Sequence, residues 1–164
     1  MDCAIVLNGE DFNPPHVGLL IGNKYYSCTV SGLKLGFSFN QLCQIFSKKK
    51  QKVIIFNTSL ILDERLVESV FVKYQNLGIE YSCYKPLKTC FELVKNKSLN
   101  AEFVYELIEL LKAEKNITAI YHFGFDYISN NLLIKIPRYK RQDVIKCINN
   151  AKIERNHKIK TAAY

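Results

Sequence analysis

Short runs of apolar residues alternate along the chain with stretches in which apolar residues recur every three or four positions. The runs have the length of β-strands, and the periodic stretches have the spacing of amphipathic helices. The pattern predicts strands at 3–7, 52–56, 79–84, 117–123 and 132–136. It predicts helices at 39–48, at 63–78, after 98–100, and in the basic stretch that follows Pro137.

Polar residues mark where several of these elements begin and end. Asp63 can cap the second helix, and Leu77-Gly78 has glycine where helices commonly stop. Ser98 or Asn100 can cap the next helix. After the first strand, Asn8-Gly9 and Asn13-Pro14-Pro15 predict a loop, and something other than a strand is expected to follow. Residues 20–36 are expected to form a hairpin-like or irregular insertion.

Alternating strands and helices are typical of an α/β protein with a mostly parallel sheet. The fully apolar run Val53 to Phe56 fits a central strand of such a sheet. A chain of 164 residues is the size of one domain. We therefore expect a single Rossmann-like α/β domain over residues 1–164, with a basic C-terminal tail from about 150 to 164.

The remaining composition excludes several classes of protein. The longest apolar runs are far shorter than the roughly 20 residues of a membrane span, so no membrane partner is expected. The N-terminus carries Asp2 and no basic segment, unlike a signal peptide, so a cytoplasmic location is expected. The six cysteines form no C-x-x-C pair, which indicates reduced and mostly buried thiols and no metal site.

The net charge of +8 is concentrated toward the C-terminus. Between residues 135 and 160 there are nine lysines and arginines against Asp143 and Glu154. Such a segment favours anionic partners, meaning phosphate, nucleotide or nucleic acid. A solvated basic tail without a specific ligand explains the same charges.

The segment from Leu7 to Leu19 follows the first strand, at the edge where ligands bind in a doubly wound sheet. A glycine such as Gly9 lets a phosphate approach the backbone, and His16 can hold a phosphate or polarise a leaving pyrophosphate. Gly18 permits close packing. The alternative is a proline-rich loop with a surface histidine.

This segment resembles the first motif of the nicotinate/nicotinamide mononucleotide adenylyltransferases, members of the nucleotidylyltransferase superfamily, which reads G-G-[ST]-F-[DN]-P-x-H-x-G-H. The matching residues are Gly9, Phe12, Asn13, Pro14, His16 and Gly18. Asp63-Glu64-Arg65-Leu66, residues 98–107 and Phe123-Gly124-Phe125-Asp126 resemble later motifs in the same order, so that the resemblance spans roughly residues 3 to 145.

The resemblance implies a protein of NAD biosynthesis that binds ATP and a mononucleotide and transfers adenylate with release of pyrophosphate, using Mg²⁺ with ATP. It implies a catalytic role for His16. The nucleotide-binding residues that it implies, together with the basic run that could hold a triphosphate, are Gly9, Asp11, Phe12, Gly18, Gly124, Asp126, Arg138, Lys140 and Arg141.

The chain departs from the family pattern at several phosphate-binding positions. Leu19 replaces the second motif histidine, no lysine lies between Val53 and Asp63 where the family has one, and residues 137–141 only loosely match the C-terminal motif. These departures favour an alternative, a catalytically impaired relative that acts as a nucleotide-, RNA- or protein-binding module. A PIN- or NYN-like domain is a weaker alternative, because Asn8, Asn100 and Gly124 occupy positions where such nucleases carry acids.

Overall fold

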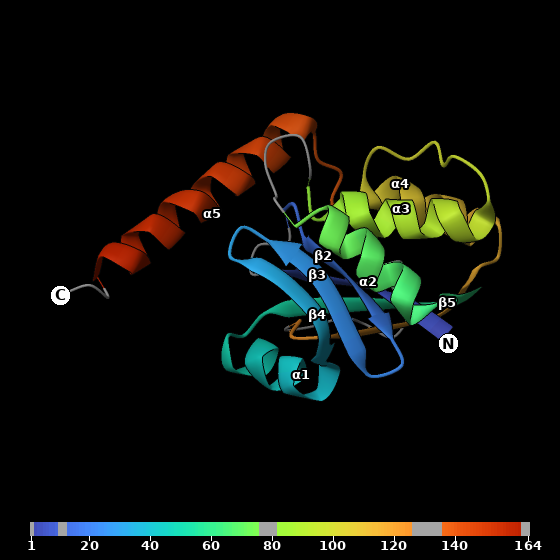
Figure 1. Cartoon of the computed structure of the whole chain (residues 1–164), viewed down its shortest axis with the longest axis horizontal. Coiled ribbons are helices and arrows are strands. Elements are labelled where there is room, and N and C mark those ends of the chain that lie inside the picture. The colour runs from blue at the N-terminus through green and yellow to red at the C-terminus, as the bar shows by residue number, and fades with distance from the viewer. Residues whose placement is uncertain (1, 10–12, 76–81, 126–135, 162–164) are drawn as a thin grey trace.

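The described residues form a six-stranded sheet, and every pair of neighbouring strands in it is antiparallel (Figure 1). The computed structural model describes residues 2–9, 13–75, 82–125 and 136–161, the last five by their backbone alone. The strand order is β4-β3-β2-β1-β5-β6. The strands are β1 (Asp2–Gly9), β2 (His16–Ile21), β3 (Lys24–Thr29), β4 (Gly32–Ser38), β5 (Lys52–Ile61) and β6 (Ile117–Phe123).

The expected mostly parallel, Rossmann-like sheet is therefore wrong. The error has a physical cause, because an apolar run such as Val53 to Phe56 shows that both faces of a strand are covered and says nothing about the direction of its neighbours. Here β5 lies between β1 and β6 and runs antiparallel to both. The crevice at the carboxyl ends of parallel strands, on which the sequence-based site depended, does not exist in this sheet.

Residues 20–36, expected to form a hairpin-like or irregular insertion, do form hairpins, but these hairpins are a regular part of the sheet. β2 begins at His16, directly after Pro15, contrary to the expectation that no strand follows the prolines. Ile21 pairs with Lys24, so that the two-residue turn Gly22-Asn23 joins β2 to β3, with Gly22 in the left-handed region at φ 56°. β4 then extends the sheet to its edge.

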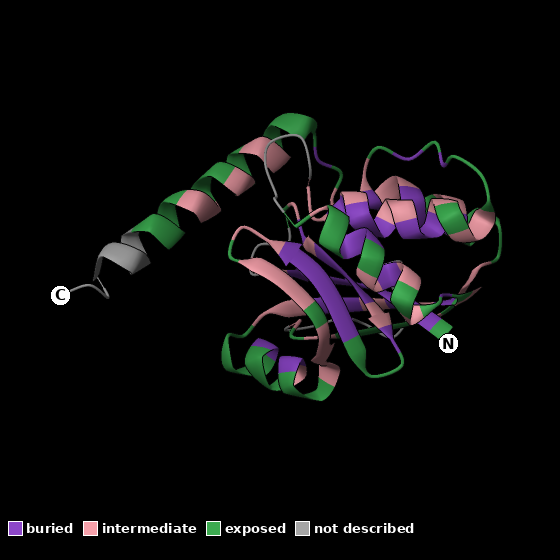
Figure 2. Ribbon diagram, in the orientation of Figure 1, coloured by how far each residue is buried: buried purple, intermediate pink, exposed green. Residues whose placement is uncertain are grey.

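Helices cover the two faces of the sheet unequally (Figures 1 and 2). Helices α2 (Glu64–Lys73), α3 (Tyr84–Lys95) and α4 (Val104–Ala113) pack on one face, which we call the helical face. Helix α1 (Phe39–Lys48) contributes Leu42 and Phe46 to a smaller apolar cluster on the opposite face. A fifth helix, α5 (Arg141–Thr161), extends away from the sheet (Figure 1).

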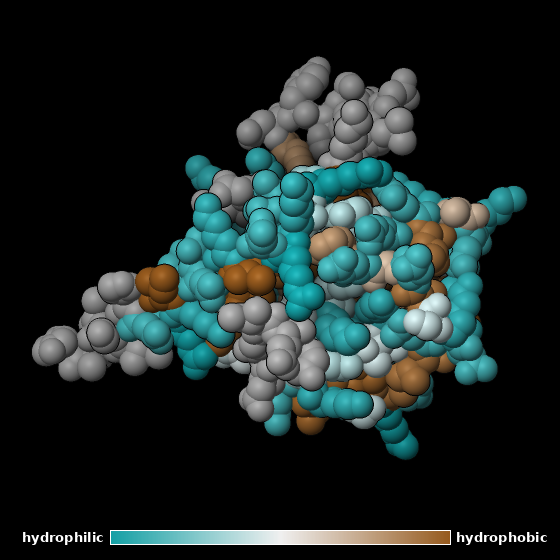
Figure 3. Space-filling view, turned by 90° about the horizontal axis from the view of Figure 1, so that it is seen from above, coloured by the Kyte–Doolittle hydropathy of each residue, from teal (hydrophilic) through white to brown (hydrophobic). Residues whose placement is uncertain are grey.

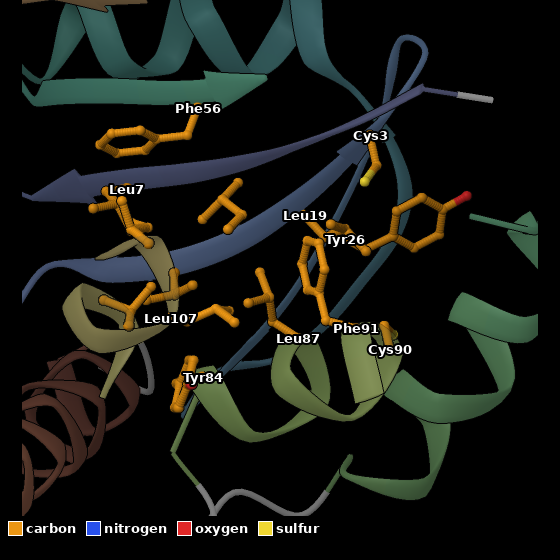
Figure 4. Close-up of a cluster of buried hydrophobic side chains, with 14 of the residues drawn as sticks. Cys3, Leu7, Leu19, Tyr26, Phe56, Tyr84, Leu87, Cys90, Phe91 and Leu107 are labelled. Carbon is orange, nitrogen blue, oxygen red and sulfur yellow. The ribbon is translucent and has the colours of Figure 1, made fainter. Parts of the chain in front are cut away.

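The main core lies between the sheet and α2, α3 and α4 (Figure 4). Leu7 and Leu19 from the strands meet Leu87 and Phe91 from α3 and Leu107 from α4. The smaller cluster on the opposite face consists of Val6, Tyr25, Leu42, Phe46 and Val53. The central strands β1 and β5 are therefore covered on both sides over part of their length, which explains apolar runs such as Val53 to Phe56.

Several expected elements are confirmed and others are not. The helix at 39–48 and the strand at 117–123 have the expected bounds. The helix capped by Asp63 is also confirmed, but it ends at Lys73 rather than at Gly78. Tyr84 begins α3 instead of ending a strand, while residues 79–81 lie outside the described residues.

The helix expected after 98–100 begins later than its proposed caps. Its N-cap is Phe103. The Glu106 carboxylate stabilises this start of the helix by accepting hydrogen bonds from the backbone N–H groups of Glu102 and Phe103 at 2.6 and 3.1 Å. Helix α3, which the sequence pattern did not predict, has Pro86 in its first turn and ends at Asn96 in the left-handed conformation.

The C-terminal segments differ from their prediction in part. Of the expected strand at 132–136, Ile136 is not in a strand and the other residues lie outside the described ones. The basic helix is confirmed as α5, which includes much of the expected tail. No helix in the described part of the chain combines the length and the apolar character that crossing a membrane requires.

The Asp63 side chain stabilises the start of α2, and this contribution to the free energy of unfolding can be measured. Its Oδ1 accepts a hydrogen bond from the Leu66 N–H at 3.0 Å. We expect Asp63→Ala to lower the free energy of unfolding by about 1 kcal/mol in urea titrations, and Asp63→Asn to retain most of it. Equal stability of Asp63→Ala and the natural chain would contradict this role of the cap.

Candidate functional site

Polar side chains gather on the face of the sheet opposite the helical face. His16 of β2 pairs across the ladder with Asn8 of β1, and two residues along, Gly18 pairs with Val6. Because strand side chains alternate between faces, Asn8, His16 and Gly18 share the face of Val6. Tyr25 and Ser27 of β3 occupy the same face.

Tyr25 lies against the backbone of Gly18. A Cβ placed on Gly18 would stand 2.2 Å from the Tyr25 hydroxyl oxygen and 2.3 Å from two ring carbons. No side chain fits at that distance, so residue 18 must be glycine as long as Tyr25 keeps this position. Because Gly18 has no Cβ, the Tyr25 hydroxyl can lie against β2, at a position two residues along the strand from His16.

Four buried side-chain atoms on this face have no hydrogen-bond partner within the described structure. They are the Asn8 Oδ1, His16 Nε2, Tyr25 hydroxyl and Ser27 Oγ atoms. We call these four residues the His16 cluster. Asn8 is 6% exposed, Tyr25 1% and Ser27 0%, whereas His16 is only partly buried as a residue.

The electrostatics of the cluster keep it neutral. Burial, together with the nearby Lys34 ammonium, lowers the pKa of His16 from 6.5 to about 4. Burial also raises the pKa of Tyr25, an effect that the neighbouring Ser27 hydroxyl opposes without reaching hydrogen-bond geometry. At neutral pH the cluster therefore presents a neutral imidazole, two hydroxyl groups and an amide oxygen.

A positive charge stands beside this neutral cluster. Lys34 of β4 pairs across the ladder with Ser27, and its Nζ lies 4.9 Å from the centre of the Phe37 ring. The Lys34 ammonium lies on the same side of the sheet as Ser27 and is close enough to lower the pKa of His16 by charge repulsion. Lys34 thus supplies a cation at the β4 side of the cluster.

The other side of the cluster is fixed by Gln51, just before β5. The Asn8 Nδ2 donates to Gln51 Oε1 at 3.1 Å, which leaves the Asn8 Oδ1 as the unpartnered atom. Gly124 follows β6 with φ 80°, and a Cβ there would stand 2.3 Å from the Gln51 carbonyl oxygen. Gly124 therefore permits a close backbone approach to Gln51.

The structure places some of the sequence-derived site residues together and separates others. His16 and Gly18 belong to one face, and Gly9 ends β1 opposite Lys52. Gly124 reaches the same region through Gln51. Asp11, Phe12 and Asp126 lie outside the described residues.

The basic run lies elsewhere. Arg138 pairs with Glu109 of α4 at 3.2 Å, and Tyr139 joins the core of the helical face. Lys140 and Arg141 are exposed at the start of α5. The described structure therefore ties Arg138 to the helical face, away from the His16 cluster, and leaves Lys140 and Arg141 exposed without an ion pair among the described residues.

Sequence reasoning identified His16 and Gly18 but missed Tyr25, Ser27 and Lys34. Asn8 was noted only as a turn residue and as a substituted acid. The available signal was a polar side chain at the inward position of an otherwise apolar strand, as at Ser27 between Tyr26 and Cys28. Using that signal required the strand pairing, which the expected parallel sheet did not contain.

Other parts of the described structure offer fewer groups that could bind a ligand. No group of three histidine, cysteine or acidic side chains among them is arranged to hold a metal ion. Burial raises the pKa of the Cys3 and Cys83 thiols to about 11, so both are protonated at neutral pH. A surface hollow of about 440 Å³ at the start of α2 is lined in part by Asp63, Glu64 and Glu68, which would repel an anion.

Comparisons of the chain with protein-family models, curated proteins and solved structures found no match. The site must therefore be interpreted from its own geometry.

The buried imidazole makes stability depend on pH. Below pH 6.5 the unfolded chain binds a proton at His16 that the folded chain binds only near pH 4, so protonation favours unfolding. We expect this residue alone to remove about 3 kcal/mol from the free energy of unfolding as the pH falls through that window. Urea titrations of the natural chain and His16→Gln measure the difference.

His122→Gln is the matched control, because His122 is an exposed histidine on β6. An NMR titration of the His16 ring reports its pKa directly if His16→Gln folds poorly. Identical pH dependence of the natural chain and His16→Gln, or a His16 pKa near 6.5, would contradict the enclosed neutral imidazole.

The unpartnered hydroxyl groups of Tyr25 and Ser27 lead to a second prediction about stability. Removing a buried hydroxyl that has no partner relieves its desolvation cost, so Tyr25→Phe and Ser27→Ala should each raise the free energy of unfolding by about 1 kcal/mol in phosphate-free buffer. Tyr84→Phe is the control, because the Tyr84 hydroxyl donates to the Ala101 carbonyl at 3.1 Å. The control should lose about 1 kcal/mol. Destabilisation by all three substitutions would show that the cluster is already satisfied.

Proposed function

We propose that this protein binds a phosphorylated small molecule of the nucleotide class at the His16 cluster. The observation that carries the proposal is that four buried polar atoms on one face of the sheet, on three neighbouring strands, have no partner among the described residues. A bound ligand would supply the hydrogen-bond partners that the described residues do not.

The energy of the unpartnered atoms supports a ligand. A buried polar group without a partner costs about 1–3 kcal/mol, and a folded domain has a total stability of only about 5–15 kcal/mol. Four such groups together would consume much of that stability. Stability sacrificed at a defined place is typical of a functional site.

The chemistry of the cluster favours a phosphate group. The Tyr25 and Ser27 hydroxyls can both donate hydrogen bonds, and neutral His16 can donate from Nε2 in one tautomer. Lys34 supplies positive charge beside them. Three neutral donors and one ammonium suit the oxygens of a phosphate, and the Asn8 Oδ1 can accept from a hydroxyl or amino group of the same ligand.

Adenylate transfer, which the family resemblance implies, is not part of this proposal. That activity belongs to a parallel sheet with a crevice at its strand ends, and this sheet is antiparallel. Arg138, expected to help hold the triphosphate, pairs with Glu109 of α4 on the helical face, on the other side of the sheet from His16. The proposal is therefore the binding module that Leu19 and the other departures already favoured, and Mg²⁺ brought by ATP has no assigned role in it.

We also propose that the protein acts in a reducing compartment, the cytoplasm. Its six cysteines are all free thiols, and Cys3, Cys28 and Cys90 are buried in the core. Such thiols are typical of proteins that are not exposed to oxidising conditions.

Titration with adenosine monophosphate, inorganic phosphate and adenosine tests the binding proposal. We expect the two phosphate-containing probes to raise the melting temperature and adenosine alone to leave it unchanged. The bound anion should also raise the pKa of His16 above 4, because a negative charge favours the imidazolium. Calorimetry and NMR of the His16 ring provide the two measurements.

Tyr25→Phe is the decisive variant, since it should be more stable than the natural chain and yet bind more weakly. Loss of one hydrogen bond to a charged group reduces affinity roughly tenfold or more. Tyr84→Phe should bind like the natural chain. The proposal fails if neither phosphate-containing probe binds, or if both bind Tyr25→Phe with unchanged affinity.

A further inference from the structure

Helix α5 carries half of the net charge of the protein. Its twenty-one residues include six lysines and arginines against Asp143 and Glu154, an excess of four from a total of +8. This concentration of charge does not involve the His16 cluster, so a role for α5 is independent of the proposed function.

Most of this charge is not neutralised within the protein. The Asp143 carboxylate is engaged in accepting a hydrogen bond from the Lys140 N–H at 2.7 Å, which fixes the start of the helix. Arg141, Lys146 and Lys152 of α5, and Lys140 just before the helix, take part in none of the ion pairs of the described residues. Three of them are exposed, and Lys152 is partly exposed.

The shape of α5 makes these charges available to a large partner. The helix is about 31 Å long at 1.5 Å per residue, and its C-terminal part extends beyond the sheet (Figures 1 and 2). The Arg155 guanidinium donates to the Val30 carbonyl in the β3–β4 turn, which holds the helix at a defined position. The helix is thus a rod held to the body near its start, where Val144 packs against the main core, and again at Arg155. Arg141, Lys146 and Lys152 lie on or beside the stretch between these two contacts.

The charges lie on two sides of the rod. Arg141 and Lys152 are eleven residues apart, which places them on one side about three turns from each other. Lys146 is turned by about 140° from Arg141. The helix has no continuous apolar face in the part that projects, where Ile153 is 56% exposed and charged residues flank it. Figure 3 shows hydrophilic side chains between isolated hydrophobic ones on this arm of the molecule.

We propose that α5 binds duplex DNA by lying in the major groove with its cations toward the phosphates of both strands. A helix of about 10–12 Å diameter fits the groove, which is about 12 Å wide. Cations on two sides of the rod match the two backbones that border the groove. An anionic lipid surface would require the continuous apolar face that α5 lacks, and the major groove of duplex RNA is too narrow for a helix.

Fluorescence anisotropy with a labelled 20-base-pair DNA duplex tests this proposal on the full chain. The test variant replaces Lys140, Arg141, Lys146 and Lys152 by glutamine. The control variant replaces Lys48, Lys49, Lys50 and Lys73, four exposed lysines outside α5, and has the same net charge. We expect the α5 variant to lose at least tenfold in affinity and to show a salt dependence lower by about 3–4 in logarithmic slope. The control should retain both.

The outcomes separate the possibilities. Equal loss in both variants would mean that net charge alone attracts DNA, which would overturn the assignment to α5. Tighter binding of single-stranded or duplex RNA of equal length would overturn the assignment to the DNA major groove, as would binding of anionic vesicles in preference to DNA. Thermal melts of both variants test whether they fold. Because α5 and the His16 cluster are separate sites, the α5 variant should still bind phosphate at the His16 cluster with the affinity of the natural chain.

Discussion

The contact between Tyr25 and Gly18 determines what the second face of the sheet can be. With a Cβ at residue 18, the Tyr25 ring would have to move from its present position. With glycine at residue 18, the Tyr25 ring packs against the backbone of β2, and its apolar part joins Val6, Leu42 and Phe46 in the smaller core. Its hydroxyl is carried into the region of His16, and so one packing contact joins the core to the polar cluster.

The two faces of the sheet consequently have different tasks. The helical face is covered by α2, α3 and α4 and holds most of the large buried side chains, including Phe56, Phe71 and Phe91. This core can maintain the fold without the other face being optimally satisfied. On the opposite face, α1 covers the apolar part and polar atoms remain unpartnered beside it. A rigid, well-packed sheet that presents an unsatisfied polar face is suited to binding, since the ligand completes an arrangement that is already in place.

The sequence predicted the local structure better than the assembly of the sheet. Periodicity identified α1 and β6 with correct bounds, and the side chain of Asp63 identified the start of α2, because these features depend on neighbouring residues. Strand direction depends on partners far along the chain. The run Val53 to Phe56 is equally apolar between antiparallel and parallel neighbours, so its composition could not reveal the topology.

The site was predictable only in part for the same reason. His16 and Gly18 attracted notice as a loop motif, yet they are strand residues whose roles come from Asn8 and Tyr25 across the ladder. Ser27 and Lys34 become neighbours only when β3 pairs with β4. The charge of α5, by contrast, is visible in the sequence itself, and the structure adds that it projects from the body and is mostly unpaired.

The central claim is that the His16 cluster lacks partners until a phosphorylated ligand binds. A high-resolution crystal structure of the protein grown with adenosine monophosphate tests this claim most directly. We expect density for a phosphate within hydrogen-bond distance of His16 Nε2 and of the Tyr25 and Ser27 hydroxyls. The claim is contradicted if those atoms are paired with protein groups or with ordered water alone while the nucleotide is absent from this face of the sheet.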